Sequence, residues 1–83
     1  MIQEINQPVE VIAVFNHGSI QPRRIRWGGR VYHVTKLVHT WRQKVGREYQ
    51  THIAVETDAY TAMELVVDPS DMSWRLATIS LEG

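Results

Sequence analysis

Turn-forming residues recur at short intervals along the whole chain, and their spacing constrains the fold more than any other feature of the sequence. Groups of Gly, Asn, Asp and Pro predict turns at residues 16–19, 28–29, 58–60 and 68–71. The segments between these turns are rich in β-branched and aromatic residues, which are typical of strands. The sequence therefore predicts an all-β fold, a small antiparallel meander of five to six strands that forms a twisted sheet or a half-open barrel.

The glycine pair at residues 28–29 is the clearest hairpin signal, because glycine readily adopts the positive φ angles of a two-residue turn. Side chains alternate along each strand, so this turn defines two faces of the hairpin. We expect three pairs on the core side: Trp27 with Arg30, Ile25 with Tyr32, and Arg23 with Val34. The outer side then carries four other side chains: Arg24, Arg26, Val31 and His33.

Residues 35–46 are compatible with two secondary structures. A helix would start at Thr35 and end before Gly46, with one apolar stripe formed by Leu37, Val38, Trp41 and Val45. A strand is the simpler interpretation, because Val, Thr, His and Trp dominate and a clear alternating strand follows at residues 49–57. A strand from residue 30 to 41 would be about 40 Å long at roughly 3.3 Å per residue, so we expect a bend or bulge in it.

The remaining strands are expected at residues 9–15, 63–67 and 74–81. Residues 1–7 are expected to fray, which leaves residues 8–83 as a single β-domain. Its core is predicted to contain Val11, Ala13, Phe15, Ile25, Trp27, Tyr32, Val34, Leu37, Ile53, Val55, Leu65, Val67, Trp74 and Leu76.

The charges are balanced in number but separated along the chain. Nine Lys or Arg residues match nine Asp or Glu residues, yet eight of the cations lie between Arg23 and Arg47. No acidic residue lies between Val11 and Arg47, whereas residues 48–83 hold seven acids and the single cation Arg75. This asymmetry indicates either a basic face for an anionic partner or internal pairing of a basic strand with an acidic one.

Composition excludes several classes of function. The chain has no Cys, and its longest apolar stretch, Val11–Phe15, has five residues, far below the roughly 20 of a membrane span. We therefore expect a soluble cytoplasmic protein that does not enter a membrane.

No pattern of catalytic or metal-binding residues is present. The serines lack a nucleophile motif, and most carboxylates lie at predicted turns, where Asp is favoured for backbone hydrogen bonding. His33 and His39 would be about 20 Å apart on one strand, too far to share a metal ion. The sequence predicts a non-catalytic domain without a metal or cofactor.

One set of scaffold positions resembles a known family. The set is Pro22-x-x-Ile25-x-Trp27-x-Gly29-Arg30-x-Tyr32-x-Val34, followed by Trp41-Arg42, Val55-Glu56-Thr57, Glu64-Leu65 and Trp74-x-Leu76. It is similar to a family of small uncharacterised bacterial β-domains that occur alone or beside relatives of Y-family DNA polymerases. The resemblance implies a compact β-domain and a link to DNA transactions, and it supplies no catalytic residues. Gly28 departs from the family pattern, in which a bulkier or charged residue is expected.

Aromatic side chains that alternate with cations are typical of single-stranded nucleic-acid binding, in which bases stack and cations follow the backbone. Trp27, Tyr32 and Trp74 are expected in the core, whereas Trp41 and Tyr49 flank the basic residues 42–47. The candidate binding residues are Arg24, Arg26, Lys36, Trp41, Arg42, Lys44, Arg47 and Tyr49. The expected partner is single-stranded nucleic acid or a DNA-processing protein. The alternative is a protein-interaction or homodimerisation module.

Overall fold

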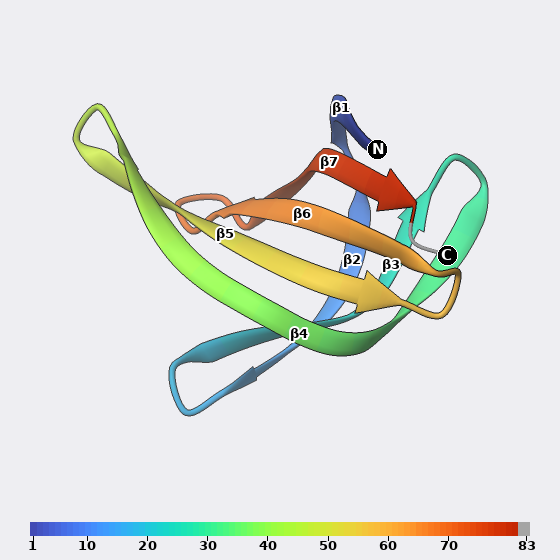
Figure 1. Ribbon diagram of the computed structural model, residues 1–83. Helices are drawn as coiled ribbons and strands as arrows, with labels where there is room; N and C mark the ends of the chain where they lie inside the picture. The colour runs from blue at the N-terminus through green and yellow to red at the C-terminus, as the bar shows by residue number, and fades with distance from the viewer. Residues whose placement is uncertain (82–83) are drawn as a thin grey trace.

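The computed structural model describes residues 1–81, which form a single antiparallel sheet of seven strands (Figure 1). The strands are β1 (Ile2–Pro8), β2 (Glu10–Asn16), β3 (Ser19–Trp27), β4 (Arg30–Val45), β5 (Glu48–Thr57), β6 (Thr61–Asp68) and β7 (Ser73–Leu81). Their order across the sheet is β1-β7-β6-β5-β4-β3-β2. The all-β prediction is confirmed, with one strand more than expected. No helix in the part of the chain described is long and apolar enough to span a membrane.

The hairpin predicted at residues 28–29 is present. Both glycines have positive φ angles, 61° for Gly28 and 75° for Gly29, and Trp27 pairs with Arg30 across the turn. Ile25 pairs with Tyr32, and both side chains are buried, as the alternation predicts. All four side chains predicted for the outer face are exposed: Arg24, Arg26, Val31 and His33.

β4 is one long strand that belongs to two parts of the sheet. Residues 30–33 pair with β3, whereas residues 34–45 pair with β5. Two register shifts, between Val34 and Lys36 and between Leu37 and His39, allow the strand to bend between its two partners. The strand interpretation of residues 35–46 is therefore confirmed, together with the expected bulges.

The N-terminal residues, which were expected to fray, form β1 instead. This strand pairs with β7, and the paired residues are 67 to 78 positions apart in the chain. Val9 alone separates β1 from β2, although these strands occupy opposite ends of the sheet. The backbone N–H of Val9 donates to the carbonyl of Trp74 at 3.2 Å, so the sheet curls until its two ends approach each other. The prediction was wrong because local sequence signals do not reveal a partner so distant along the chain.

The core lies inside the curl. Its buried apolar side chains are Ile25, Tyr32, Ile53, Val55, Met63, Leu65, Val67, Leu76 and Ile79. Two residues predicted to be buried are exposed, Phe15 at 59% and Leu37 at 40%. Phe15 lies near the end of a projecting hairpin, and Leu37 lies beside a bulge where β4 leaves β3. Met63 and Ile79, which pair across β6 and β7, belong to the core and were not predicted.

Two hairpins extend beyond the multi-stranded part of the sheet (Figure 1). The β2–β3 arm comprises residues 13–22, because β3 pairs with β4 only from Arg24 onward. The β4–β5 arm comprises residues 42–50, because β5 pairs with β6 only from Thr51 onward. Both arms point to the left in Figure 1, the β2–β3 arm below and the β4–β5 arm above.

Candidate nucleic-acid interface

A groove lies where β3 and β4 separate, between the two arms. It contains two neighbouring hollows that share Ser19 in their walls. The larger has a volume of about 480 Å³ and is lined by Gly18, Ser19, Ile20, Thr40, Trp41, Arg42 and Thr51. The smaller has a volume of about 240 Å³ and is lined by Ser19, Gln21, Pro22, Arg23, Val34, Thr35, Lys36 and Leu37. Both arms therefore contribute walls to the same groove.

Cations occur along the groove. Arg42 lines the larger hollow, and Arg23 and Lys36 line the smaller one. Lys44 follows Arg42 by two residues on β4, so it lies on the same face of the β4–β5 arm. All four side chains belong to exposed residues, which makes them accessible to a bound anion.

Arg23 reaches the groove because of a bulge. The sequence placed it on the core side opposite Val34, but the β2–β3 register passes from Ile12–Arg24 to Ala13–Pro22 and leaves Arg23 without a partner. The extra residue turns the Arg23 side chain outward, where its Nη2 donates to Gln21 Oε1 at 3.1 Å. The predicted Arg23–Val34 pair is wrong, because β4 leaves β3 after His33 and Val34 pairs with Thr57 of β5. Arg23 was therefore missed as a groove cation.

Aromatic and apolar side chains accompany these cations. The guanidinium carbon of Arg42 lies 4.6 Å from the centre of the Tyr49 ring, and Tyr49 pairs with Lys44. On the other arm, Phe15 pairs with Ile20, which lines the larger hollow. Directly opposed residues share a face, so the exposed Phe15 ring lies on the groove side of its arm. Phe15 was predicted to be in the core and was therefore missed as a candidate binding residue.

Trp41 is held in a different way from the one that the sequence indicated. It adjoins the larger hollow, but its ring stacks on His39 at 5.3 Å and on His52 at 5.2 Å between ring centres. His52 is buried, and its Nδ1 lies 3.3 Å from Glu64 Oε2. These stacks occupy the Trp41 ring, so Tyr49 and Phe15 are the more accessible aromatic side chains of the groove.

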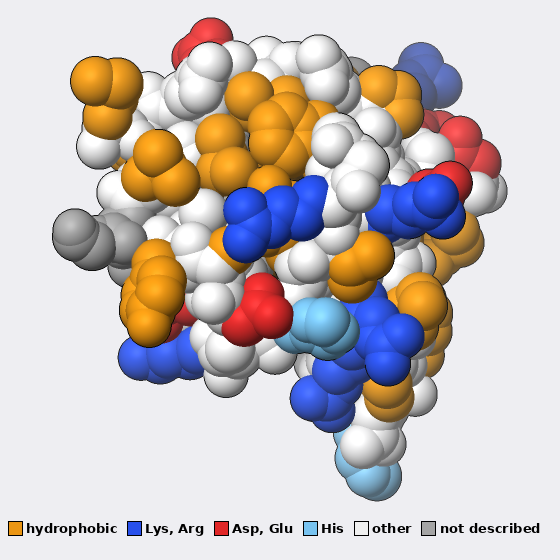
Figure 2. Space-filling model, turned by 90° about the vertical axis from the view of Figure 1, so that its right-hand side faces the viewer, with side chains coloured by type: hydrophobic (Ala, Val, Ile, Leu, Met, Phe, Trp, Pro, Cys, Tyr) orange, Lys and Arg blue, Asp and Glu red, His pale blue; other side chains and the backbone are white. Residues whose placement is uncertain are grey.

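The structure does not bring all of the predicted residues together. Arg24 and Arg26 lie on the outer face of the β3–β4 hairpin, where they line a separate hollow with Ile12 and Val31. Arg47 lies at the turn of the β4–β5 arm. Figure 2 shows Lys and Arg side chains interspersed with apolar ones on the side of the molecule that carries the β3–β4 turn. The groove thus contains Lys36, Arg42, Lys44 and Tyr49 from the predicted set, with Trp41 at its wall.

Among residues 1–81, the acidic half forms no ion pair with a Lys or Arg. Within residues 1–81, Arg26 is the one Lys or Arg that forms an ion pair, with Glu10 at 3.7 Å. The other carboxylates in ion pairs contact histidines, Asp58 with His33 and Glu64 with His52. The basic strand β4 does pair with β5 of the acidic half, and Lys36 lies opposite Glu56, but no ion pair between a Lys or Arg and an acid of residues 48–81 is formed.

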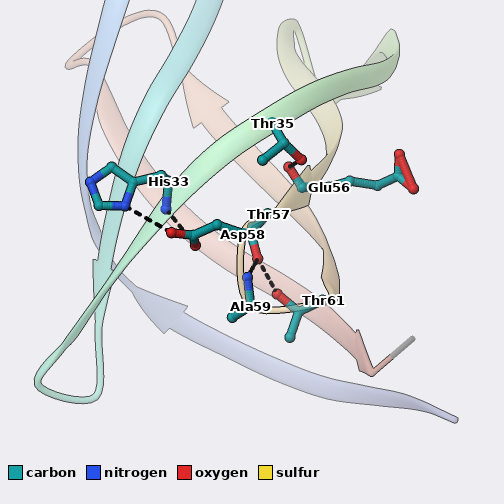
Figure 3. Close-up of polar contacts among 7 residues, drawn as sticks. All are labelled: His33, Thr35, Glu56, Thr57, Asp58, Ala59 and Thr61. Atoms are coloured by element: carbon teal, nitrogen blue, oxygen red, sulfur yellow. Dashed lines mark hydrogen bonds and ion pairs between the residues drawn. The ribbon is translucent and has the colours of Figure 1, made fainter. Parts of the chain in front are cut away.

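A cluster of polar contacts fixes the position at which β4 leaves β3 (Figure 3). Asp58, in the β5–β6 turn, accepts hydrogen bonds from the backbone N–H of His33 at 3.1 Å and contacts His33 Nδ1 at 3.0 Å. These contacts, led by the backbone N–H, lower the pKa of Asp58 below its ordinary value. Inside the same turn, the hydroxyls of Thr57 and Thr61 are 2.6 Å apart. The cluster therefore anchors the β5–β6 turn to β4 at the end of β5 that is remote from the β4–β5 arm.

No group of three His, Cys, Asp or Glu side chains is arranged to hold a metal ion among residues 1–81. No protein-family model matches the chain, and neither the curated proteins nor the solved structures compared with it include a significant match. The resemblance to the β-domains associated with Y-family polymerases stays a prediction.

Proposed function

We propose that this protein is a non-catalytic domain that binds single-stranded nucleic acid in the groove between its two arms. The observation that carries the proposal is a set of exposed groove cations that form no ion pair with a carboxylate of residues 1–81: Arg23, Lys36, Arg42 and Lys44. Cations that the fold leaves unpaired are available to neutralise phosphates, which supply most of the affinity in sequence-independent binding.

The aromatic side chains favour a single strand over a duplex. In a duplex the base faces are stacked on each other, whereas an unpaired strand offers them to aromatic rings. Tyr49 and Phe15 are both exposed on the groove side of their arms, one on each wall. A strand that passes between the arms can stack bases on these rings while its phosphates follow the cations.

The first experiment is a fluorescence-anisotropy titration of labelled single-stranded and double-stranded oligonucleotides at several salt concentrations. Four phosphate contacts would make the logarithm of the association constant fall with the logarithm of salt concentration with a slope of about −3, since each contact contributes about −0.7 on single strands. We expect the single strand to bind more tightly than the duplex of the same sequence.

A pair of variants tests which surface is used. Arg42→Ala combined with Lys44→Ala should reduce affinity and roughly halve the salt slope. Arg24→Ala combined with Arg26→Ala is the matched control, because it removes two exposed arginines from the outer face. Absence of binding at low salt would contradict the proposed function, and an equal loss in both variants would contradict the groove as its site.

A further inference from the structure

The outer edge of β2 is an unpaired strand edge with an unusually apolar sequence. β2 is the last strand of the sheet, and within residues 1–81 it pairs with β3 on one side and with no strand on the other. Its residues 11–15 are all apolar, and Ile12, Val14 and Phe15 are 61%, 41% and 59% exposed. An exposed, apolar edge of this kind is a template for pairing with another strand.

The opposite end of the sheet is protected against such pairing. The edge strand there, β1, contains Glu4 and the left-handed residue Asn6, whose φ angle is 53°. Its register against β7 shifts between Glu4 and Gln7, and it ends at Pro8, which has no backbone N–H. Charge, irregular backbone and proline are the features by which proteins protect edge strands. β2 has no proline, and its bulge with β3 places the extra residue, Arg23, on β3.

The free edge of β4 in the groove differs from β2 in charge. If two copies of β4 paired antiparallel about Thr40, Lys36 of one copy would lie opposite Lys44 of the other. Like charges directly opposite each other destabilise a strand pair. The β4 edge therefore disfavours self-association.

We propose that β2 pairs antiparallel with β2 of a second copy, so that the two sheets become continuous across a two-fold axis at Ala13. This register places Ile12 opposite Val14 on the outer face and Val11 opposite Phe15 on the inner face. Each contact occurs twice, as an isologous interface requires. On the outer face, the exposed Ile12 and Val14 of one copy are covered by Val14 and Ile12 of the other.

The charges of β2 are compatible with this arrangement. The only charged residue in β2 is Glu10, which lies opposite Asn16 of the second copy and already pairs with Arg26 of its own chain. Equal numbers of acidic and basic residues give the whole chain a formal charge of zero, so little long-range repulsion opposes association. Because one pair of seven-residue edges is a small contact, the dimer is a reversible one.

The test is sedimentation velocity of the full chain over a concentration series, without nucleic acid. Ile12→Glu should raise the dimer dissociation constant about tenfold or more, because it places one carboxylate in each of the two apolar Ile12–Val14 pairs. Val31→Glu is the matched control: Val31 is an exposed, outer-face valine that lines the same hollow as Ile12 but lies on β4, away from the edge. The new carboxylate faces Arg24 in Ile12→Glu and Arg26 in Val31→Glu, so the two variants have similar surroundings within their own sheet. Thermal unfolding checks that both variants fold.

A second measurement tests the register. The chain has no Cys, so Ala13→Cys introduces a single thiol that can form a disulfide only with another copy. At the two-fold axis the two Cα atoms would be about 4.5–5.5 Å apart, which is within disulfide range. Covalent dimer from Ala13→Cys but not from Val31→Cys under mild oxidation is the expected result.

Three results would overturn the inference. They are a monomer at every concentration, equal loss of the dimer in both Glu variants, and no preference for the Ala13→Cys crosslink. These measurements contain no nucleic acid. A monomeric result therefore leaves strand binding in the groove untouched, and a failure to bind a strand leaves the dimer untouched.

Discussion

Asp58 binds His33 through both of its carboxylate oxygens, one 3.1 Å from the backbone nitrogen and the other 3.0 Å from ring Nδ1. In return, the backbone N–H of Asp58 donates to the carbonyl oxygen of His33 at 2.9 Å. The two residues are 25 positions apart in the chain, and the contact joins the β5–β6 turn to β4 where that strand leaves β3. A carboxylate at a turn thus holds β4 against the β5–β6 turn at the point where β4 passes from β3 to β5.

The Asp58–His33 contact predicts a dependence of stability on pH. Its hydrogen bonds hold the pKa of Asp58 below the ordinary value of 3.8. A lowered pKa in the folded state adds stability that is complete above the unfolded pKa and is lost as pH falls through the folded pKa. Asp58→Asn should therefore be less stable at neutral pH, and its free energy of unfolding should fall less steeply in acid.

Urea unfolding at a series of pH values measures this effect. Asp71, whose pKa is lowered by hydrogen bonds from Ser73, gives the variant some remaining acid sensitivity. Asp71→Asn is a useful comparison, because Asp71 lies in the β6–β7 turn and accepts its hydrogen bond from the neighbouring Ser73. An identical acid profile for the wild type and Asp58→Asn would contradict the assignment.

Leu65 is predicted to be essential to the core, since its side chain is completely buried on the central part of β6. Leu65→Ala should lower the free energy of unfolding by about 2–5 kcal/mol, through lost burial and the cavity that remains. Leu81→Ala is the control, because Leu81 is largely exposed and should cost little. Chemical denaturation measures the free energy of unfolding of both variants, which can be compared if its slope against denaturant concentration is the same. An equal loss of free energy in both variants would show that Leu65 is not part of a packed core.

Gly29 is predicted to be required by its backbone conformation, since its φ angle is 75° and no heavy atom lies within 4 Å of where a Cβ would be. Space is therefore available, and the cost of a side chain is conformational. Gly29→Ala should destabilise the protein by about 1–2 kcal/mol, whereas Gly29→Asn should cost less, because Asn tolerates left-handed backbone better. Thermal unfolding of both variants gives the ranking, and an Ala variant at least as stable as the Asn variant would refute it.

Tyr49 is predicted to contribute to nucleic-acid binding by stacking. Tyr49→Ala should weaken single-strand binding by about 1–3 kcal/mol, whereas Tyr49→Phe keeps the ring and should change affinity little. Trp41→Ala should act differently, because its ring stacks on His39 and His52 and supports the fold. Anisotropy titrations combined with unfolding measurements distinguish the two effects. Loss of affinity in Tyr49→Phe would point to the hydroxyl instead of stacking.

Much of the sheet could be predicted because its signals are local. Gly28 and Gly29 define a turn, and alternation then gives the pairing of Ile25 with Tyr32. The bend in β4 was predicted from the length of the strand alone, since a strand of that length must bend or contain a bulge. Local patterns of this kind do not depend on which distant segment lies nearby.

The candidate site was less predictable. Lys36, Arg42, Lys44 and Tyr49 were identified from composition, but the same reasoning grouped them with Arg24 and Arg26, which lie on the outer face of the β3–β4 hairpin. A single bulge residue, Arg23, changed faces because the register of β2 against β3 shifts there. Alternation along a strand does not predict the face of a side chain beyond a bulge, since one extra residue moves each later side chain to the opposite face.

The sequence by itself determined that the chain forms an antiparallel β-domain, where most of its turns lie, and that eight of its nine cations precede seven of its nine acids. The tertiary structure alone decided that residues 2–8 pair with β7, that two arms line a groove, and that the acids within residues 48–81 form no ion pair with the groove cations. The physical reason is range. Turn preference and alternation act between neighbours in the chain, whereas pairing of the ends, curling of the sheet and the surroundings of a charge depend on residues far apart in sequence.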